Sequence, residues 1–119
     1  MSPTLSDEER VKKTRDILVS HKGKKNVISA PDIAKIIGID EGDTHVQTRR
    51  IVLKAMRKYG IPVASTNTKP PGYFLITNRD ELDEYRASLQ NRIWEQEDRI
   101  RLVLENFVNT YGPLDEGEE

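Results

Sequence analysis

The feature that most constrains this chain is a series of apolar residues at helical spacing in its C-terminal third. Apolar side chains recur at intervals of three and four from Leu82 to Phe107. This spacing predicts one continuous helix over residues 78–111, in which the apolar stripe covers about 30 residues, or about 45 Å at about 1.5 Å per residue. The rest of the chain forms too small a core to cover such a length, so part of the apolar stripe needs another surface.

We expect that surface to be the same helix of a second copy. Residues 82–89, with Tyr85 between two leucines, are predicted to pack on the protein's own first helix, and the later part of the stripe to form a homodimer. Gln96 interrupts the stripe, where a polar residue can set the register of a coiled coil. The alternative is a helix that bends back and buries the stripe within one chain. The residues assigned to dimerisation are Trp94, Ile100, Leu104 and Phe107.

Length and composition favour one small domain with an appendage. The chain has 119 residues, of which 35% are apolar and 33% charged, and it contains no cysteine. No stretch approaches the roughly 20 apolar residues that span a bilayer, and the start lacks the basic and apolar regions of a signal peptide. We therefore expect no membrane partner, a cytoplasmic or nucleoid-associated protein, and an acidic disordered tail over residues 112–119.

Charge is strongly segregated along the chain although the net charge is only −1. Residues 10–72 carry fourteen Lys and Arg against five Asp and Glu, whereas residues 73–119 carry five against twelve. Such a segregation of charge bears on binding partners rather than on fold, and it favours an anionic ligand for residues 10–72. The alternative is that these charges only solvate helix surfaces. The acidic C-terminal region is a candidate site for a protein partner.

Two helix starts are marked by serine caps. Ser6 and Glu9 have capping-box spacing, which predicts a first helix from about residue 7 to 21. Ser29, followed by Pro31 in the first turn, predicts a second helix that ends at Gly38. The short segment "NVIS", residues 26–29, is predicted as a minimal strand.

A third helix and a hairpin follow the acidic turn "IDEGD". The helix is predicted to begin at residue 43 or 44, because Thr44 and Gln47 have capping-box spacing, and to end at Gly60. Strands are expected at about 61–65 and 72–76, joined by the polar loop "STNTKPP".

This order of elements resembles the winged helix-turn-helix family over residues 8–77. The segment "ISAPDIAKIIGID" is similar to the first helix of the motif with its turn, "THVQTRRIVLKAMRKYGIP" to the recognition helix, and "VASTNTKPPGYFLI" to the wing. Sequences of this style that continue into a long charged helix are similar to small phage and prophage DNA-binding proteins. The resemblance implies a DNA-binding domain over residues 1–77.

The angular distribution of residues on the third helix suggests which side meets DNA. At 100° per residue, Leu53, Met56 and Gly60 define a core sector with Val46 and Val52 at its edges. Arg49 falls inside that sector, so either the helix starts later or the aliphatic part of this side chain carries its guanidinium out to solvent. An exposed polar stripe is also ordinary solvated surface. The residues assigned to DNA reading are Thr44, Gln47, Thr48, Arg50, Ile51, Lys54 and Lys58, with Ala55 and Arg57 beside them.

The hairpin loop and a basic loop add candidate phosphate contacts. Pro70 and Pro71 stiffen the hairpin loop, which lowers the entropic cost of holding it against a ligand. The alternative is an ordinary hairpin whose prolines protect an edge strand. The residues assigned to backbone contacts are Asn67, Thr68 and Lys69 in the hairpin, and Lys24 and Lys25 in the basic loop. Lys22, Ser65 and Thr66 are further candidates.

No pattern of catalytic residues is visible. His21 and His45 are the only histidines, and each lies beside a predicted helix end, where a surface position is expected. We expect no catalytic residue, no cofactor and no metal. The function expected is sequence-specific binding of double-stranded DNA, as a transcriptional or phage-type regulator. The alternatives are a protein-interaction or architectural module and a replication or recombination accessory factor.

Overall fold

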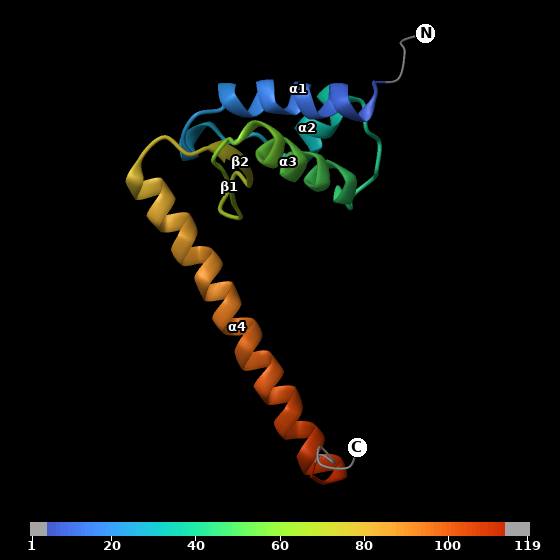
Figure 1. Cartoon of the computed structure of the whole chain (residues 1–119), viewed down its shortest axis with the longest axis vertical. Coiled ribbons are helices and arrows are strands. Elements are labelled where there is room, and N and C mark those ends of the chain that lie inside the picture. The colour runs from blue at the N-terminus through green and yellow to red at the C-terminus, as the bar shows by residue number, and fades with distance from the viewer. Residues whose placement is uncertain (1–4, 114–119) are drawn as a thin grey trace. The chain divides into compact units, whose positions relative to one another are not determined.

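The computed structural model describes residues 5–113, which form four α-helices, one 3-10 turn and one antiparallel hairpin (Figure 1). The chain divides into two compact units, Met1–Asp83 (the first unit) and Glu84–Glu119 (the second unit). The expected mainly helical α+β class is confirmed, whereas the expected tail lies outside the described residues from position 114 onward. The elements are α1 (Asp7–Ser20), η1 (Lys24–Asn26), α2 (Ala30–Ile37), α3 (Val46–Tyr59), β1 (Val63–Thr66), β2 (Gly72–Leu75) and α4 (Arg79–Tyr111).

The predicted starts of α1 and α2 are confirmed by their caps. The Ser6 hydroxyl accepts a hydrogen bond from the Glu9 N–H at 3.1 Å, and the Glu9 carboxylate accepts one from the Ser6 N–H at 2.9 Å. Ser29 caps α2 through the Asp32 N–H at 3.2 Å. Each cap satisfies a backbone donor that has no partner inside the helix. Gly38 ends α2 with φ 77°, a conformation that glycine adopts without a Cβ clash.

A single arginine joins α1 to the end of α2. The Arg10 guanidinium donates from Nε to the Ile37 carbonyl and from Nη2 to the Gly38 carbonyl, both at 3.0 Å. These carbonyls lie at the end of α2, where the last backbone acceptors lack helical partners and the helix dipole is negative. Arg10 therefore satisfies two acceptors and fixes the angle at which the two helices meet.

The segment between α1 and α2 is attached to β2 at two points but forms no strand. Ile28 makes an isolated bridge to Tyr73, with N–H to carbonyl distances of 2.9 and 2.8 Å in the two directions. The Gly23 N–H donates to the Leu75 carbonyl at 2.9 Å. Between these points η1 turns away from the sheet edge, so no second residue pairs beside Ile28. The predicted minimal strand at 26–29 is therefore reduced to the single bridge at Ile28.

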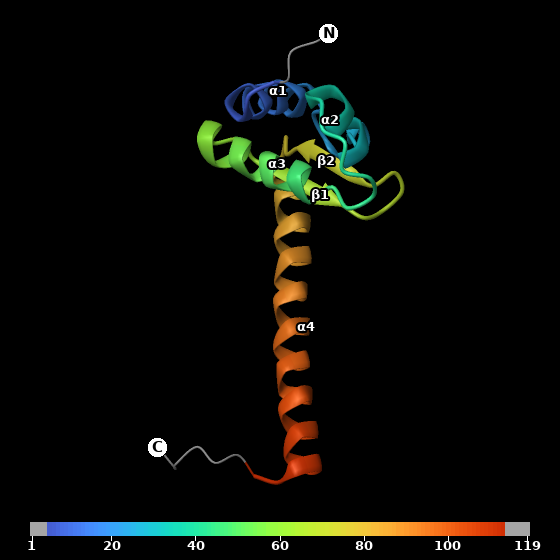
Figure 2. The same ribbon diagram turned by 90° about the vertical axis from the view of Figure 1, so that its right-hand side faces the viewer.

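The hairpin pairs β1 with β2 in the register Val63↔Leu75 to Thr66↔Gly72 (Figure 2). Both strands lie within two residues of the predicted bounds. Gly72 passes so close to the preceding loop that a Cβ placed on it would lie 2.4 Å from the Ile28 carbonyl oxygen. Only glycine permits this approach, which brings the two attachment points of the loop onto β2.

The third helix starts later than predicted. It begins at Val46, and His45 before it has φ 52°, outside the helical region. The predicted capping box between Thr44 and Gln47 is absent, because the Gln47 N–H donates to the Glu41 carboxylate at 2.6 Å instead. The predicted end at Gly60 is confirmed, since this glycine has φ 64° and its N–H donates to the Met56 carbonyl.

The predicted core face of α3 is only partly right: Val52 is buried and Met56 packs against the core, as predicted. Val46 and Leu53, expected at the core, are 50% and 43% exposed. The core instead receives residues from the predicted DNA-reading side. Apolar residues occur on both sides of this helix, so its own pattern does not decide which side packs, and contact with α1 does. The buried residues of α3 are Thr48, Ile51, Val52 and Ala55.

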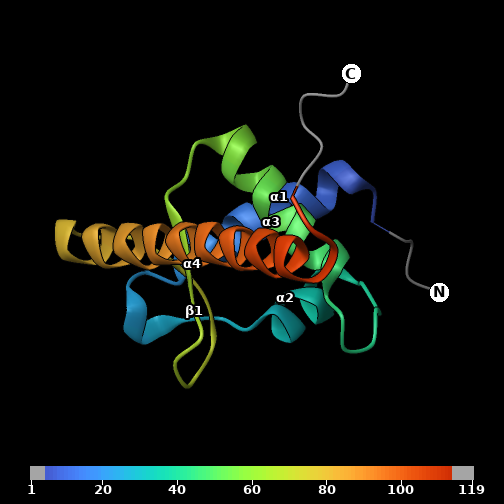
Figure 3. The ribbon, with the colours of Figure 1, turned by 90° about the horizontal axis from the view of Figure 1, so that it is seen from below.

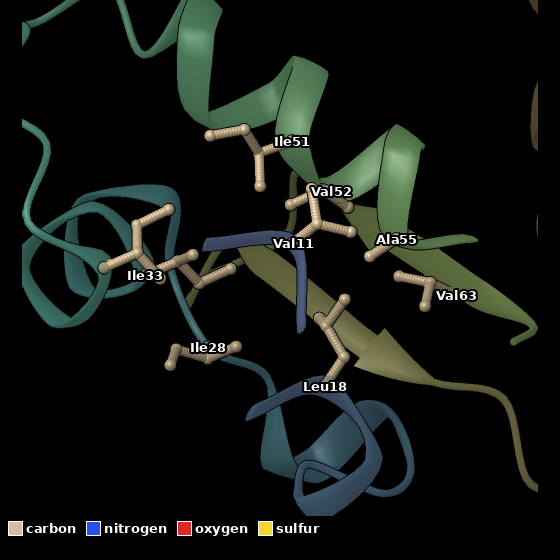
Figure 4. Packing of buried hydrophobic residues seen from close by; sticks show 9 residues of the cluster. Val11, Leu18, Ile28, Ile33, Ile51, Val52, Ala55 and Val63 are labelled. Atoms are coloured by element: carbon tan, nitrogen blue, oxygen red, sulfur yellow. The ribbon is translucent and has the colours of Figure 1, made fainter. Parts of the chain in front are cut away.

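The hydrophobic core lies entirely in the first unit, among α1, α2, α3 and the hairpin. Figure 4 shows Ile51, Val52 and Ala55 pointing from α3 into the cluster that Val11 and Leu18 enter from α1. All five are at most 5% exposed. At about 25 cal/mol per Å² of apolar surface removed from water, such packing is the main stabilising contribution in a small domain.

The long C-terminal helix is confirmed with nearly its predicted bounds. The Asn78 side chain accepts a hydrogen bond from the Glu81 N–H at 2.9 Å and so marks the helix start. α4 has 33 residues, or about 50 Å at 1.5 Å per residue. None of its residues is buried, including Leu82 and Leu89, for which burial on the first helix is predicted.

Candidate nucleic-acid interface

α3 carries a cationic exposed face, although not with all the predicted members. Gln47, Arg50, Lys54 and Lys58 are exposed there, and Thr44 is exposed just before the helix. Thr48 and Ile51, also predicted to contact DNA, are 0% and 1% exposed and belong to the core. Burial in the free protein therefore removes these two residues from the candidate site.

Arg49 and Arg57 extend this exposed face. Arg49, predicted inside the core sector, is exposed, and its guanidinium donates to the Thr44 carbonyl at 2.8 Å. The later helix start does not explain this exposure, because Arg49 still lies within α3; the predicted core sector is displaced, and Leu53, which helped to define it, is 43% exposed. Arg50 and Arg57 are exposed and have no carboxylate within ion-pair distance among residues 5–113. Two guanidinium groups on one face are thus open to an external acceptor.

The two lysines of α3 are paired with the first turn of α1. Lys54 Nζ lies 2.7 Å from the Asp7 carboxylate, and Lys58 Nζ lies 3.8 Å from the Glu8 carboxylate. The hydrogen bond from Lys54, together with its charge, lowers the pKa of Asp7 below its ordinary value of 3.8. These residues, with Val11 and Arg57, line an open hollow of about 460 Å³ between the two helices.

The N-terminus of α3 is occupied by a side chain of the protein itself. The Glu41 carboxylate accepts hydrogen bonds from the Gln47 N–H at 2.6 Å, the Thr48 N–H at 2.9 Å and the Thr48 hydroxyl at 2.7 Å. Burial raises the pKa of Glu41, but these three hydrogen bonds and the nearby His45 outweigh it and hold the pKa below 4.5. The backbone donors that could bind a phosphate at this helix end are therefore already used.

His45 differs from its expected surface position. It is half-buried, adopts φ 52°, and its Nδ1 has no hydrogen-bond partner within the described part of the chain. A non-glycine residue in the left-handed region is uncommon and indicates a constrained turn. His21 is held differently, with Nδ1 2.9 Å from the Asn26 carbonyl oxygen.

A second cationic site forms where the basic loop meets the hairpin loop. Figure 3 shows the 22–26 segment and the hairpin on the same side of the first unit, and together they line an open hollow of about 570 Å³, the basic hollow. The predicted residues Lys24, Lys25, Thr68 and Lys69 all line it, although more than 40 positions separate the two loops. The full lining is Lys22, Gly23, Lys24, Lys25, Asn26, Thr66, Thr68, Lys69, Pro70 and Glu81.

Backbone attachments and one carboxylate shape the basic hollow. The attachments of Gly23 and Ile28 to β2 leave η1 beside the hairpin loop. Glu81 accepts hydrogen bonds from the Lys24 N–H at 2.9 Å and from the Thr77 N–H at 2.8 Å. The bond from the Thr77 backbone, followed by that from Lys24, lowers the pKa of Glu81, so the carboxylate stays ionised. Four lysines against one carboxylate leave the hollow positive.

Among the polar residues that line the basic hollow, sequence reasoning missed Asn26 and Glu81, and it included Asn67, which does not line it. Lys22, Asn26 and Thr66 lie in it, while Asn67 is exposed at the tip of the loop. Lys22 belongs to the same basic segment as Lys24 and Lys25, and its charge marked it as a further candidate in the sequence. The Thr66 hydroxyl, 2.7 Å from that of Thr68, comes into the hollow only through the hairpin register.

Other features do not indicate a chemical site. Among residues 5–113 there is no group of His, Asp and Glu side chains arranged to hold a metal ion. No helix in that range combines the length and apolar character needed to cross a membrane. Comparison of the chain with protein families, with curated proteins and with solved structures finds no match.

Proposed function

We propose that the first unit binds double-stranded DNA as a winged helix-turn-helix module, with α3 in the major groove and the hairpin loop on the backbone or in the minor groove. The protein then acts without catalysis, as a transcriptional or phage-type regulator. The observation that carries this proposal is the basic hollow, where two cationic loops distant in sequence converge. Lysine ammonium and threonine hydroxyl groups are common partners of phosphate oxygens.

The exposed face of α3 supplies the groups that would read bases. Gln47 and Arg50 are exposed on its first two turns, and their side chains can make paired hydrogen bonds to adenine and guanine edges, respectively. Arg57 lies two turns further on and suits a phosphate. The buried Thr48 and Ile51 have structural roles instead, so a smaller set of residues than predicted would determine specificity.

Binding would exchange internal ion pairs for contacts with phosphate. Lys54 and Lys58 face carboxylates of α1 across exposed pairs, which contribute little to stability because water screens them. A phosphate can therefore replace Asp7 or Glu8 at low cost. Replacing both acids with Asn and Gln should strengthen binding to all duplexes alike.

The test is the salt dependence of duplex binding. Neutralising Lys22, Lys25 and Lys69 with Gln should reduce the slope of log affinity against log salt by about 0.9 for each phosphate that the variant no longer neutralises. Changing Lys12, Lys13 and Lys35 to Gln removes the same charge from exposed positions on α1 and α2 and is the matched control. Equal slopes for the two variants would contradict a phosphate site in the basic hollow.

A second candidate function is recognition of an acidic protein surface. The exposed face of α3 mixes arginines with Val46 and Leu53, and protein interfaces are enriched in arginine around apolar contacts. Selection from a random duplex pool near physiological salt separates the two functions. Enrichment of a sequence motif supports a regulator, and duplex binding without enrichment supports an architectural or replication accessory role. Absence of duplex binding favours the protein partner.

A further inference from the structure

The second unit exposes large apolar side chains along α4. Ile93, Ile100 and Val103 are 48%, 61% and 58% exposed, and Leu104 and Phe107 are exposed to a similar degree. An isolated helix gains little stability without tertiary packing, and soluble proteins rarely leave an apolar stripe of this length uncovered. The stripe therefore requires a partner, and its repeat indicates which one.

Five of the exposed apolar residues follow a seven-residue repeat. With positions named a to g, Ile93, Ile100 and Phe107 occupy a, and Leu89 and Val103 occupy d. The remaining d positions hold Gln96 and Thr110. Leu104 and Tyr111, at e, flank this seam, whereas Trp94 and Val108, at b, and Leu102, at c, lie outside it. Apolar residues at every a position and at two of the four d positions of residues 89–110 follow the pattern of a coiled coil, and isoleucine at a is compatible with two strands.

We propose that α4 forms a parallel two-stranded coiled coil with α4 of a second copy over residues 89–110. The proposal goes beyond DNA binding and does not depend on it. In a parallel pair, each a residue packs beside its own equivalent, so Ile93, Ile100 and Phe107 form three symmetric layers. Gln96 faces Gln96 of the second copy, where the two amides can hydrogen-bond and fix the register.

Charge complementarity selects the parallel orientation. In a parallel pair, position g of one helix faces position e of the next heptad in the other, which places Arg92 opposite Glu97 of the second copy, twice by symmetry. Arg99, also at g, faces the apolar Leu104. In an antiparallel pair a faces d and g faces g, so Ile93 and Ile100 no longer pack on their own equivalents, and neither Arg92 nor Arg99 faces Glu97.

Sedimentation equilibrium of the full-length protein tests the assembly. At tens of micromolar the unchanged chain should be a dimer, and Ile100→Glu should raise the dissociation constant by at least about 100-fold, because it places two charges in the seam. Trp94→Gln, outside the seam, is the matched control and should remain dimeric. A monomeric unchanged protein would overturn the proposal, as would a Trp94→Gln variant that dissociates as strongly as Ile100→Glu.

Cysteine crosslinking tests the orientation, and the absence of native cysteine makes a single introduced thiol specific. Gln96→Cys and Thr110→Cys replace polar d residues two heptads apart, so neither removes an apolar contact. A parallel pair brings each thiol to its own equivalent, and both variants should form disulfide-linked dimers under mild oxidation. Asn91→Cys, at the outer f position, should not. An antiparallel pair can link at most one of the two d variants, and that result would overturn the orientation.

These measurements need no nucleic acid, so their failure is distinguishable from failure of the DNA-binding proposal. If both proposals hold, two copies of α3 share a two-fold axis. The preferred target is then a pseudo-palindrome with half-sites about one helical turn apart or a multiple of it.

Discussion

At the scale of single residues, Gly72 is where the hairpin passes closest to the segment before α2. A Cβ at this position would lie 2.4 Å from the Ile28 carbonyl oxygen and 2.7 Å from its carbon, and both are backbone atoms that cannot rotate away. Gly72→Ala should therefore push the loop off β2 and destabilise the fold by about 1 to 3 kcal/mol. Urea unfolding followed by circular dichroism measures this, with Asn67→Ala at the loop tip as control. A loss below about 0.5 kcal/mol, within the range of neutral surface changes, would show that the attachment is dispensable.

Glu41 is the residue whose protonation state matters most for α3. Its pKa is held below the ordinary value of 4.5 in the folded protein, so the unfolded chain binds the proton more readily. The stabilisation it contributes is complete above pH 4.5 and is lost as the pH falls through the folded-state pKa. Glu41→Gln keeps one acceptor and removes the charge. The difference in unfolding free energy between the unchanged protein and the Glu41→Gln variant should shrink from pH 6 to pH 3.5. A difference that does not change with pH would mean that the charge of the Glu41 carboxylate does not contribute to stability.

At the scale of elements, the junction of α1 and α2 depends on Arg10. Arg10→Met retains most of the aliphatic stem but removes both donors to the end of α2, and it should destabilise the first unit by about 1 to 2 kcal/mol. Lys13→Met, on the exposed side of the same helix, controls for the loss of charge. Equal urea midpoints for the two variants would show that hydrogen bonds from water replace those from Arg10 to the Ile37 and Gly38 carbonyls without loss of stability.

At the scale of the whole molecule, the folded core and the long helix are separable. Every buried apolar residue among the described positions lies between Val11 and Phe74. A chain truncated after Ser88 should therefore unfold cooperatively, with a free energy within about 0.5 kcal/mol of the monomeric Ile100→Glu variant. The comparison with a monomer removes the concentration dependence that a dimer would add. Loss of the cooperative transition would show that the second unit supports the core.

Local signals in the sequence determined where most elements begin and end. Ser6, Ser29 and Asn78 mark helix starts because their side chains bond backbone donors within three residues, and Gly38 and Gly60 mark ends because they adopt positive φ. The hairpin and the length of α4 were also predictable from local patterns, namely turn residues between apolar runs and apolar residues at helical spacing. Each of these signals depends on residues that are neighbours along the chain, so a short stretch of sequence contains it.

Tertiary contacts alone decided which face of α3 is buried and how the basic hollow forms, whereas a side chain six residues away along the chain decided where α3 starts. Both sides of α3 carry apolar residues, and packing on α1 selects the one with Ile51 and Ala55. The helix starts at Val46 because the Glu41 side chain, six residues from Gln47, takes the first donors. The basic loop reaches the hairpin loop through the bonds from Gly23 and Ile28 to β2 and from the Lys24 N–H to Glu81, which join segments 45 or more residues apart that no local pattern connects.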